Sequence, residues 1–79
     1  MLSDGLKIFR ADVVDEFTDT QALWNVVAKT YDEALKMFIK EANDVWDIYY
    51  YHFYELEDED EIETFLEYYE NVVEGIYEL

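Results

Sequence analysis

The chain has no cysteine, no proline and only two glycines. Without cysteine it can form neither a disulfide framework nor a thiolate metal site, and it has no thiol nucleophile. It also contains no apolar run long enough to cross a bilayer, and its first residues lack the basic region, apolar stretch and cleavage site of a secretory signal. These absences predict a cytoplasmic protein. Its negative charge disfavours binding to an anionic membrane surface.

Basic side chains are also missing from the second half of the chain. No Lys or Arg follows Lys40, whereas the segment from Glu41 onward holds fourteen of the 21 acidic residues. The whole chain carries a formal net charge of -16. Charge concentrated in this way repels itself and does little for folding. The asymmetry therefore favours a role outside the fold, most simply the binding of a strongly basic partner surface.

Apolar and aromatic residues, by contrast, are abundant. Hydrophobic residues make up 52% of the chain and aromatic residues 19%, which is too apolar for a disordered acidic tail. A length of 79 residues predicts a single domain over residues 1–79, with a core that supplies only a few kcal/mol of net stability.

Three segments have the composition and alternation of β-strands. The first two are separated by a polar stretch at 15–21, which predicts an antiparallel hairpin. In the second strand, Trp24 and Val26 fall on the face opposite Asn25. The predicted strands are residues 6–14, 22–29 and 45–56.

Two segments have helical signals. The sequence Thr-Tyr-Asp-Glu at 30–33 is a capping box, which predicts a helix that starts there and ends at 43–44. Asp58 or Asp60 is expected to cap a last helix at 59–77. The second and third strands, joined through a helix, should be parallel by a right-handed crossover. The sequence therefore predicts an α+β fold, a small ββαβα domain with a three-stranded mixed sheet and two helices on one face.

The last predicted helix carries a row of glutamates along one flank of its apolar stripe. At about 100° per residue, the row occupies an arc of roughly 80°. Like charges at helical spacing destabilise a helix by roughly 0.2–0.5 kcal/mol per pair, so the row favours a binding role over a merely solvated face. The row consists of Glu63, Glu67, Glu70, Glu74 and Glu78, extended at the start of the helix by Asp58, Glu59, Asp60 and Glu61.

Tyrosines offer a second binding element. Tyr49, Tyr51 and Phe53 alternate onto one face of the third strand, and this face is expected to lie away from the helices. Exposed tyrosine is favoured at interfaces because it offers a large contact area at little entropic cost. The alternative is that a second copy of the chain buries this face in a homodimer. Tyr68 is a further candidate contact.

The sequence does not favour an enzyme or a metalloprotein. His52 is the only histidine and Ser3 the only serine, so we expect no catalytic Ser-His pair. The acidic segment 57–61 lacks the alternating Asp or Asn positions and the central glycine of a calcium loop. We therefore predict no catalytic residue, no cofactor and no metal site.

A short, cysteine-free, strongly acidic chain with a glutamate row and nearby tyrosines resembles the DNA-mimic inhibitor proteins of phages and mobile elements. The resemblance covers the C-terminal half and rests on charge pattern, without a shared motif. It implies a protein in the host cytoplasm that evades host defence by protein-protein interaction and does not itself bind nucleic acid. The implied partner is a basic nucleic-acid-binding protein, such as a histone-like nucleoid protein, a restriction or CRISPR effector, a uracil-DNA glycosylase or a nuclease.

Two other classes fit the same composition. Acidic immunity proteins and antitoxins, which cap the basic active site of a toxic nuclease, are similar in size and charge. A structural homo-oligomeric protein could instead carry a solvated acidic face for solubility.

Overall fold

The computed structural model describes residues 5–15, 21–45, 48–69 and 72–78. Its elements confirm the α+β class, but they follow the order ββαβαβ, because a fourth strand follows the last helix. The elements are β1 (Lys7–Asp15), β2 (Gln21–Ala28), α1 (Tyr31–Val45), β3 (Ile48–Glu55), α2 (Glu59–Tyr68) and β4 (Gly75–Glu78).

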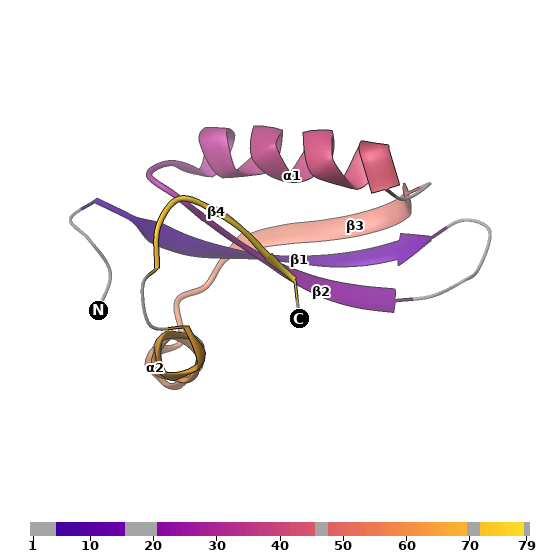
Figure 1. The fold of residues 1–79 in the computed structure, drawn as a ribbon. Helices are drawn as coiled ribbons and strands as arrows, with labels where there is room; N and C mark the ends of the chain where they lie inside the picture. Colours follow the sequence, from indigo (N-terminus) through magenta and orange to yellow (C-terminus); the bar gives the residue numbers. More distant parts are fainter. Residues whose placement is uncertain (1–4, 16–20, 46–47, 70–71, 79) are drawn as a thin grey trace.

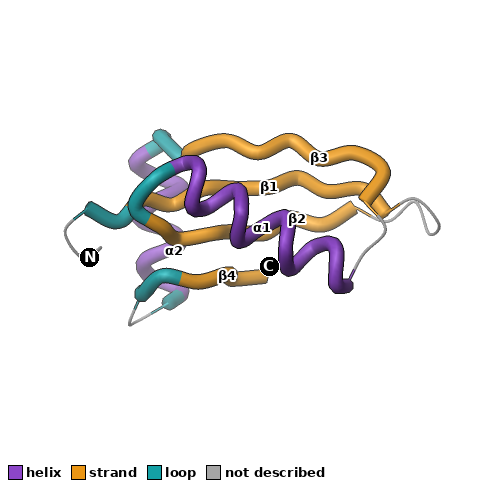
Figure 2. Tube along the Cα trace, turned by 90° about the horizontal axis from the view of Figure 1, so that it is seen from above, coloured by secondary structure: helices purple, strands orange, loops and turns teal. Residues whose placement is uncertain are grey.

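The strands form one four-stranded sheet in the order β3-β1-β2-β4 (Figure 2). Each neighbouring pair is antiparallel, so the predicted three-stranded mixed sheet is wrong in strand number and in pairing. The crossover through α1 does make β2 and β3 run in the same direction, as expected. They form no parallel ladder, however, because β1 lies between them and pairs with both.

The first face of the sheet is covered by α1, which runs along it (Figure 1). Its buried Phe38 packs against Trp24 of β2, with ring centroids 5.8 Å apart, and against Phe53 of β3 at 5.5 Å. The helix begins where the capping box predicts, since the backbone N–H of Glu33 donates to Thr30 Oγ1 at 3.2 Å. This layer is the larger part of the hydrophobic core.

The second helix lies on the opposite face, near one end of the sheet (Figure 1). Phe65 of α2 packs there against Ile8, Val27 and Leu56, and Val72 completes the cluster. The prediction that both helices cover one face is therefore wrong. The physical reason is that β1 and β2 are apolar on both faces at this end, which leaves a second surface to be buried.

The predicted helix at 59–77 is too long, because α2 ends at Tyr68 and Tyr69 is already extended, with φ -118° and ψ 122°. Beyond it, Gly75 and the β-branched Ile76 have low helix propensity, and the chain joins β2 as an edge strand instead. A helix continued to 77 would also have kept more glutamates at repulsive spacings. The predicted start is confirmed, because the Asp58 side chain caps the helix.

The two faces of β3 are also exchanged relative to expectation. Phe53 is only 7% exposed, and the Tyr51 ring lies 5.4 Å from that of Phe38, so both face α1. The open face carries Tyr50, which is 59% exposed, and His52. The side chain of Tyr49 lies outside the described part of the structure. The alternation was predicted correctly, but the choice of covered face was not.

Neither of the two helices in the described ranges is long and apolar enough to cross a membrane.

Candidate functional site

The predicted glutamate row is divided among several elements. Only Glu63 and Glu67 lie on α2. Glu74 is exposed in the connection that precedes β4, while Glu78 belongs to β4 and its side chain is outside the described part. Glu70 lies outside the described residues. The prediction of one continuous helical row is therefore wrong, because the helix that would have aligned these residues ends too early.

Two further acids of the predicted surface have structural roles. Asp58 Oδ1 accepts hydrogen bonds from the backbone N–H groups of Asp60 and Glu61, at 2.9 and 3.3 Å. Glu61 Oε2 lies 2.7 Å from Nη1 of Arg10, as an ion pair across 51 positions of sequence. Acidic residues in the first turn of α2 also interact favourably with the helix dipole. Part of the charge thus stabilises the helix itself.

The remaining carboxylates of this segment form a compact exposed surface. At about 100° per residue, its four helical members lie within an arc of roughly 100° on one flank of α2. None of these carboxylates takes part in the two ion pairs among the described residues, Lys7–Glu55 and Arg10–Glu61. We call it the α2 acidic surface. It consists of Glu57, Glu59, Asp60, Glu63 and Glu67.

The other flank of α2 is aromatic. Tyr68 is 79% exposed, and its ring centroid lies 5.1 Å from that of Tyr69. Of the three tyrosines predicted to contact a partner, Tyr68 is thus available on the surface. Tyr51 is 40% exposed but packs partly against Phe38 on the face covered by α1, away from α2. Tyr68 lies on the same short helix as the α2 acidic surface, so the structure brings these two predicted features together.

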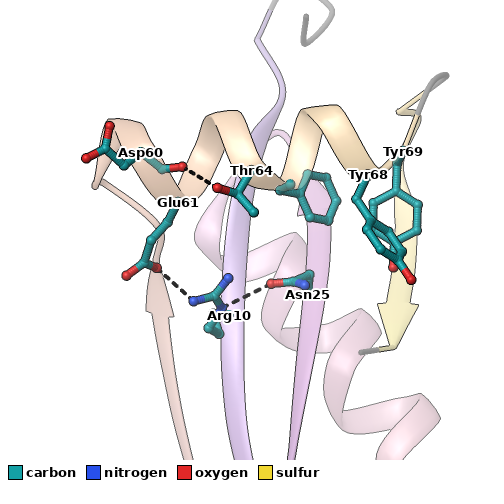
Figure 3. A pocket seen from close by; sticks show the side chains of 8 residues that line it. Arg10, Asn25, Asp60, Glu61, Thr64, Tyr68 and Tyr69 are labelled. Atoms are coloured by element: carbon teal, nitrogen blue, oxygen red, sulfur yellow. Dashed lines mark hydrogen bonds and ion pairs between the residues drawn. The ribbon is translucent and has the colours of Figure 1, made fainter.

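A pocket of about 350 Å³ lies between α2 and the sheet (Figure 3). Its floor comes from Arg10 of β1 and Asn25 of β2, which are direct neighbours in the antiparallel register. Its roof and walls come from α2 and from the residue that follows it. The lining residues are Arg10, Asn25, Asp60, Glu61, Thr64, Phe65, Tyr68 and Tyr69. We call it the α2 pocket.

The polar groups of the α2 pocket form a short network that Figure 3 shows from close by. Arg10 Nε donates to Asn25 Oδ1 at 3.2 Å, while Arg10 Nη1 donates to Glu61 at 2.7 Å. Asn25 is fully buried, and its Nδ2 has no hydrogen-bond partner among the described residues. A buried amide N–H without an acceptor is destabilising, so Asn25 Nδ2 is a polar group of the pocket that a bound acceptor would stabilise.

Sequence reasoning missed the α2 pocket. The available signal was a polar residue within each of two apolar strands, Arg10 in the first and Asn25 in the second. Their alignment depends on the hairpin register, and the contribution of Tyr69 depends on where α2 ends. Neither could be fixed from local patterns.

A second hollow, of about 740 Å³, lies farther along the same sheet face, where neither described helix covers the strands. It is lined by Val14, by Leu23, which is 41% exposed, and by Tyr50. Within the described ranges, no three His, Asp or Glu side chains come together as a metal-binding cluster.

Comparisons of the chain with protein-family models, curated proteins and solved structures found no match.

Proposed function

We propose that this protein is an inhibitor that binds the basic nucleic-acid-binding surface of another protein and blocks its access to DNA. The observation that carries the proposal is the α2 acidic surface, in which five exposed carboxylates gather on and beside one short helix and form no ion pair among the described residues. The basic surface of a nucleic-acid-binding protein normally binds a row of phosphates. The carboxylates of the α2 acidic surface would compete with those phosphates for the same Lys and Arg side chains.

The charge of the whole molecule supports the same function. A net charge of -16 attracts a basic partner over long distances, which speeds association and makes it sensitive to salt. Tyr68, on the neighbouring flank of α2, supplies an exposed ring that can pack against the partner once the charges have met. We place this activity in the cytoplasm of a host cell, where nucleic-acid-binding proteins of the defence and nucleoid classes are found.

The test is a pull-down with the tagged full chain from a bacterial lysate, with mass spectrometry of the bound proteins. We expect a basic DNA-binding protein that is retained at low salt and released by duplex DNA. Its affinity is then measured for the variant with Glu63→Lys and Glu67→Lys. We expect binding to weaken by about tenfold to 100-fold at low salt, because two attractive contacts become repulsive.

A matched control separates the α2 acidic surface from net charge. The double variant Glu41→Lys and Asp44→Lys makes the same change in charge on exposed positions of α1. It should bind with nearly unchanged affinity. Equal weakening by the two double variants would reduce the effect to net charge and refute a specific role for α2. A captured protein that duplex DNA cannot displace would favour an immunity protein that caps a toxin.

The uncovered half of the second sheet face favours a second candidate, a homo-oligomeric structural protein. Leu23 and Tyr50 are large apolar residues exposed there, and a second copy could bury them. Sedimentation at low and high salt distinguishes the candidates. A stable oligomer that captures no basic protein would support the structural candidate, whereas a monomer that captures one would support the inhibitor.

A further inference from the structure

The floor of the α2 pocket contains a buried hydrogen-bond donor that the chain leaves without a partner. Asn25 is fully buried, and its Oδ1 is held by Arg10 Nε at 3.2 Å. That bond fixes the orientation of the amide, so its Nδ2 is the group left over. Because an unpaired buried donor costs stability, a ligand that brings an acceptor to this point gains the hydrogen bond in full.

The walls of the pocket favour a flat ligand. Phe65 and Tyr69 have ring centroids 4.8 Å apart, and Tyr68 adds an exposed ring beside them. The volume of about 350 Å³ lies within the range of small-molecule sites, which begin at roughly 300 Å³. It greatly exceeds the roughly 30 Å³ of a single water molecule. An aromatic ring that displaces water from these side chains gains contact area on entry.

The charges around the pocket exclude other ligand classes. The Arg10 guanidinium is already paired with Glu61, and Asp60 also lines the pocket, so an anion would find no unpaired cation there. The net charge of -16 repels anions further. A simple ammonium or guanidinium cation has donors only and cannot accept a hydrogen bond from Asn25 Nδ2. The ligand that remains is neutral and carries an acceptor.

We propose that the α2 pocket binds a small, flat, neutral molecule with a carbonyl-type acceptor, of the chemical class of the aromatic carboxamides. Its oxygen accepts from Asn25 Nδ2, and its ring packs against the aromatic side chains that line the pocket, Phe65, Tyr68 and Tyr69. This proposal does not rest on the proposed inhibitory function: the two sites share Asp60 and Tyr68 at their border, but the binding group of the pocket is Asn25 on the sheet, which the inhibitory function does not use. Loss of partner binding would leave it intact.

The probe is benzamide, titrated into the ¹⁵N-labelled full chain and followed by two-dimensional NMR. We expect saturable shifts of the Asn25 side-chain amide and of the backbone amides of Tyr68 and Tyr69. Benzoate and benzylammonium have the same ring. Benzoate is an anion, and benzylammonium is a cation that has no hydrogen-bond acceptor. Each should bind at least about tenfold more weakly than benzamide. Equal binding of benzoate, or no shift at millimolar benzamide, would overturn the proposal.

Two variants locate the interaction. Asn25→Asp keeps an oxygen for Arg10 but removes the N–H₂ group, and we expect benzamide affinity to fall at least about tenfold. Tyr68→Ala truncates a side chain that is 79% exposed, so it should weaken binding several-fold without changing the unfolding midpoint. Tyr50→Ala, at an exposed position outside the pocket, is the matched control and should bind normally.

The two variants together keep the proposal falsifiable. If Asn25→Asp folds and binds benzamide as tightly as the natural chain, Asn25 Nδ2 is not the binding group and the proposal fails. If Asn25→Asp does not fold, Tyr68→Ala decides. Binding weakened by Tyr68→Ala but not by Tyr50→Ala supports the α2 pocket, whereas equal effects of these two substitutions refute it.

Discussion

Arg10 joins the sheet to α2 through hydrogen bonds. Its side chain is 17% exposed, and it satisfies both Asn25 below it and Glu61 above it. Replacing such a residue leaves a buried amide oxygen without its donor, and that loss costs more than the loss of a solvated ion pair. A second ion pair joins Lys7 of β1 to Glu55 of β3 at 3.8 Å, and because both side chains are exposed it contributes much less.

We therefore expect Arg10→Met to lower the free energy of unfolding by about 2 kcal/mol. Lys7→Met should lower it by less than about 0.5 kcal/mol. Both variants remove one positive charge from β1, so the control cancels the effect of net charge. Urea denaturation followed by circular dichroism measures both. Similar losses in the two variants would contradict a special role for the network around Arg10.

At the residue scale, the sequence predicted what depends on near neighbours. The cap at Thr30 and the cap at Asp58 each involve groups two or three positions apart, and both are present in the structure. The Arg10–Glu61 pair spans 51 positions, so no local pattern could predict it. The same applies to the α2 pocket, whose floor and roof meet only after the sheet has formed.

At the element scale, the clearest discrepancy is the division of one predicted helix into α2 and β4. The apolar positions up to Tyr69 have helical spacing, and Val72, Val73 and Ile76 continue that spacing closely enough to extend the prediction. The short strand β4 instead alternates its side chains, so that Ile76 packs against the first apolar cluster and Tyr77 against the second. In the structure, Val72 and Tyr77 reach the same apolar cluster through a turn and a strand. Periodicity alone cannot distinguish these arrangements, since the outcome depends on the free edge of β2.

The side chain of Tyr77 is hydrogen-bonded to the connection that precedes β4, which provides a test of where α2 ends. The Tyr77 hydroxyl accepts from the backbone N–H of Val73 at 3.0 Å and donates to its carbonyl at 2.8 Å. We expect Tyr77→Phe to lower the free energy of unfolding by about 1 kcal/mol, because both hydrogen bonds are lost.

Tyr68→Phe, which removes a hydroxyl from an exposed side chain of α2, is the control and should leave the free energy unchanged. Chemical denaturation measures both variants. In a helix continued to residue 77, the N–H of Val73 would bond to the carbonyl four residues before it instead of to a side chain. A Tyr77→Phe variant as stable as the natural chain would therefore support the longer helix and contradict the strand.

On the scale of the whole molecule, the fold must tolerate a net charge of -16 on 79 residues. The helix α2 ends at Tyr68 and is capped by Asp58, but the carboxylates of the α2 acidic surface form no ion pair among the described residues. Uncompensated charge repels itself more in the compact state than in the expanded unfolded chain, so it lowers stability. The sequence predicted this imbalance directly, because composition does not depend on the placement of elements.

Salt should therefore stabilise this protein. Between about 10 mM and 150 mM NaCl the Debye length falls from about 30 Å to about 8 Å, which screens repulsion between distant carboxylates. We expect the thermal unfolding midpoint, measured by circular dichroism, to rise by several °C over this range. The variant with Glu63→Gln and Glu67→Gln should have a higher midpoint at low salt and a smaller response to salt, because it carries less of the repulsive charge. A midpoint that is constant or falls as salt is added would mean that the carboxylates do not strain the fold, and the acidic half of the chain would then be explained as a solvated surface.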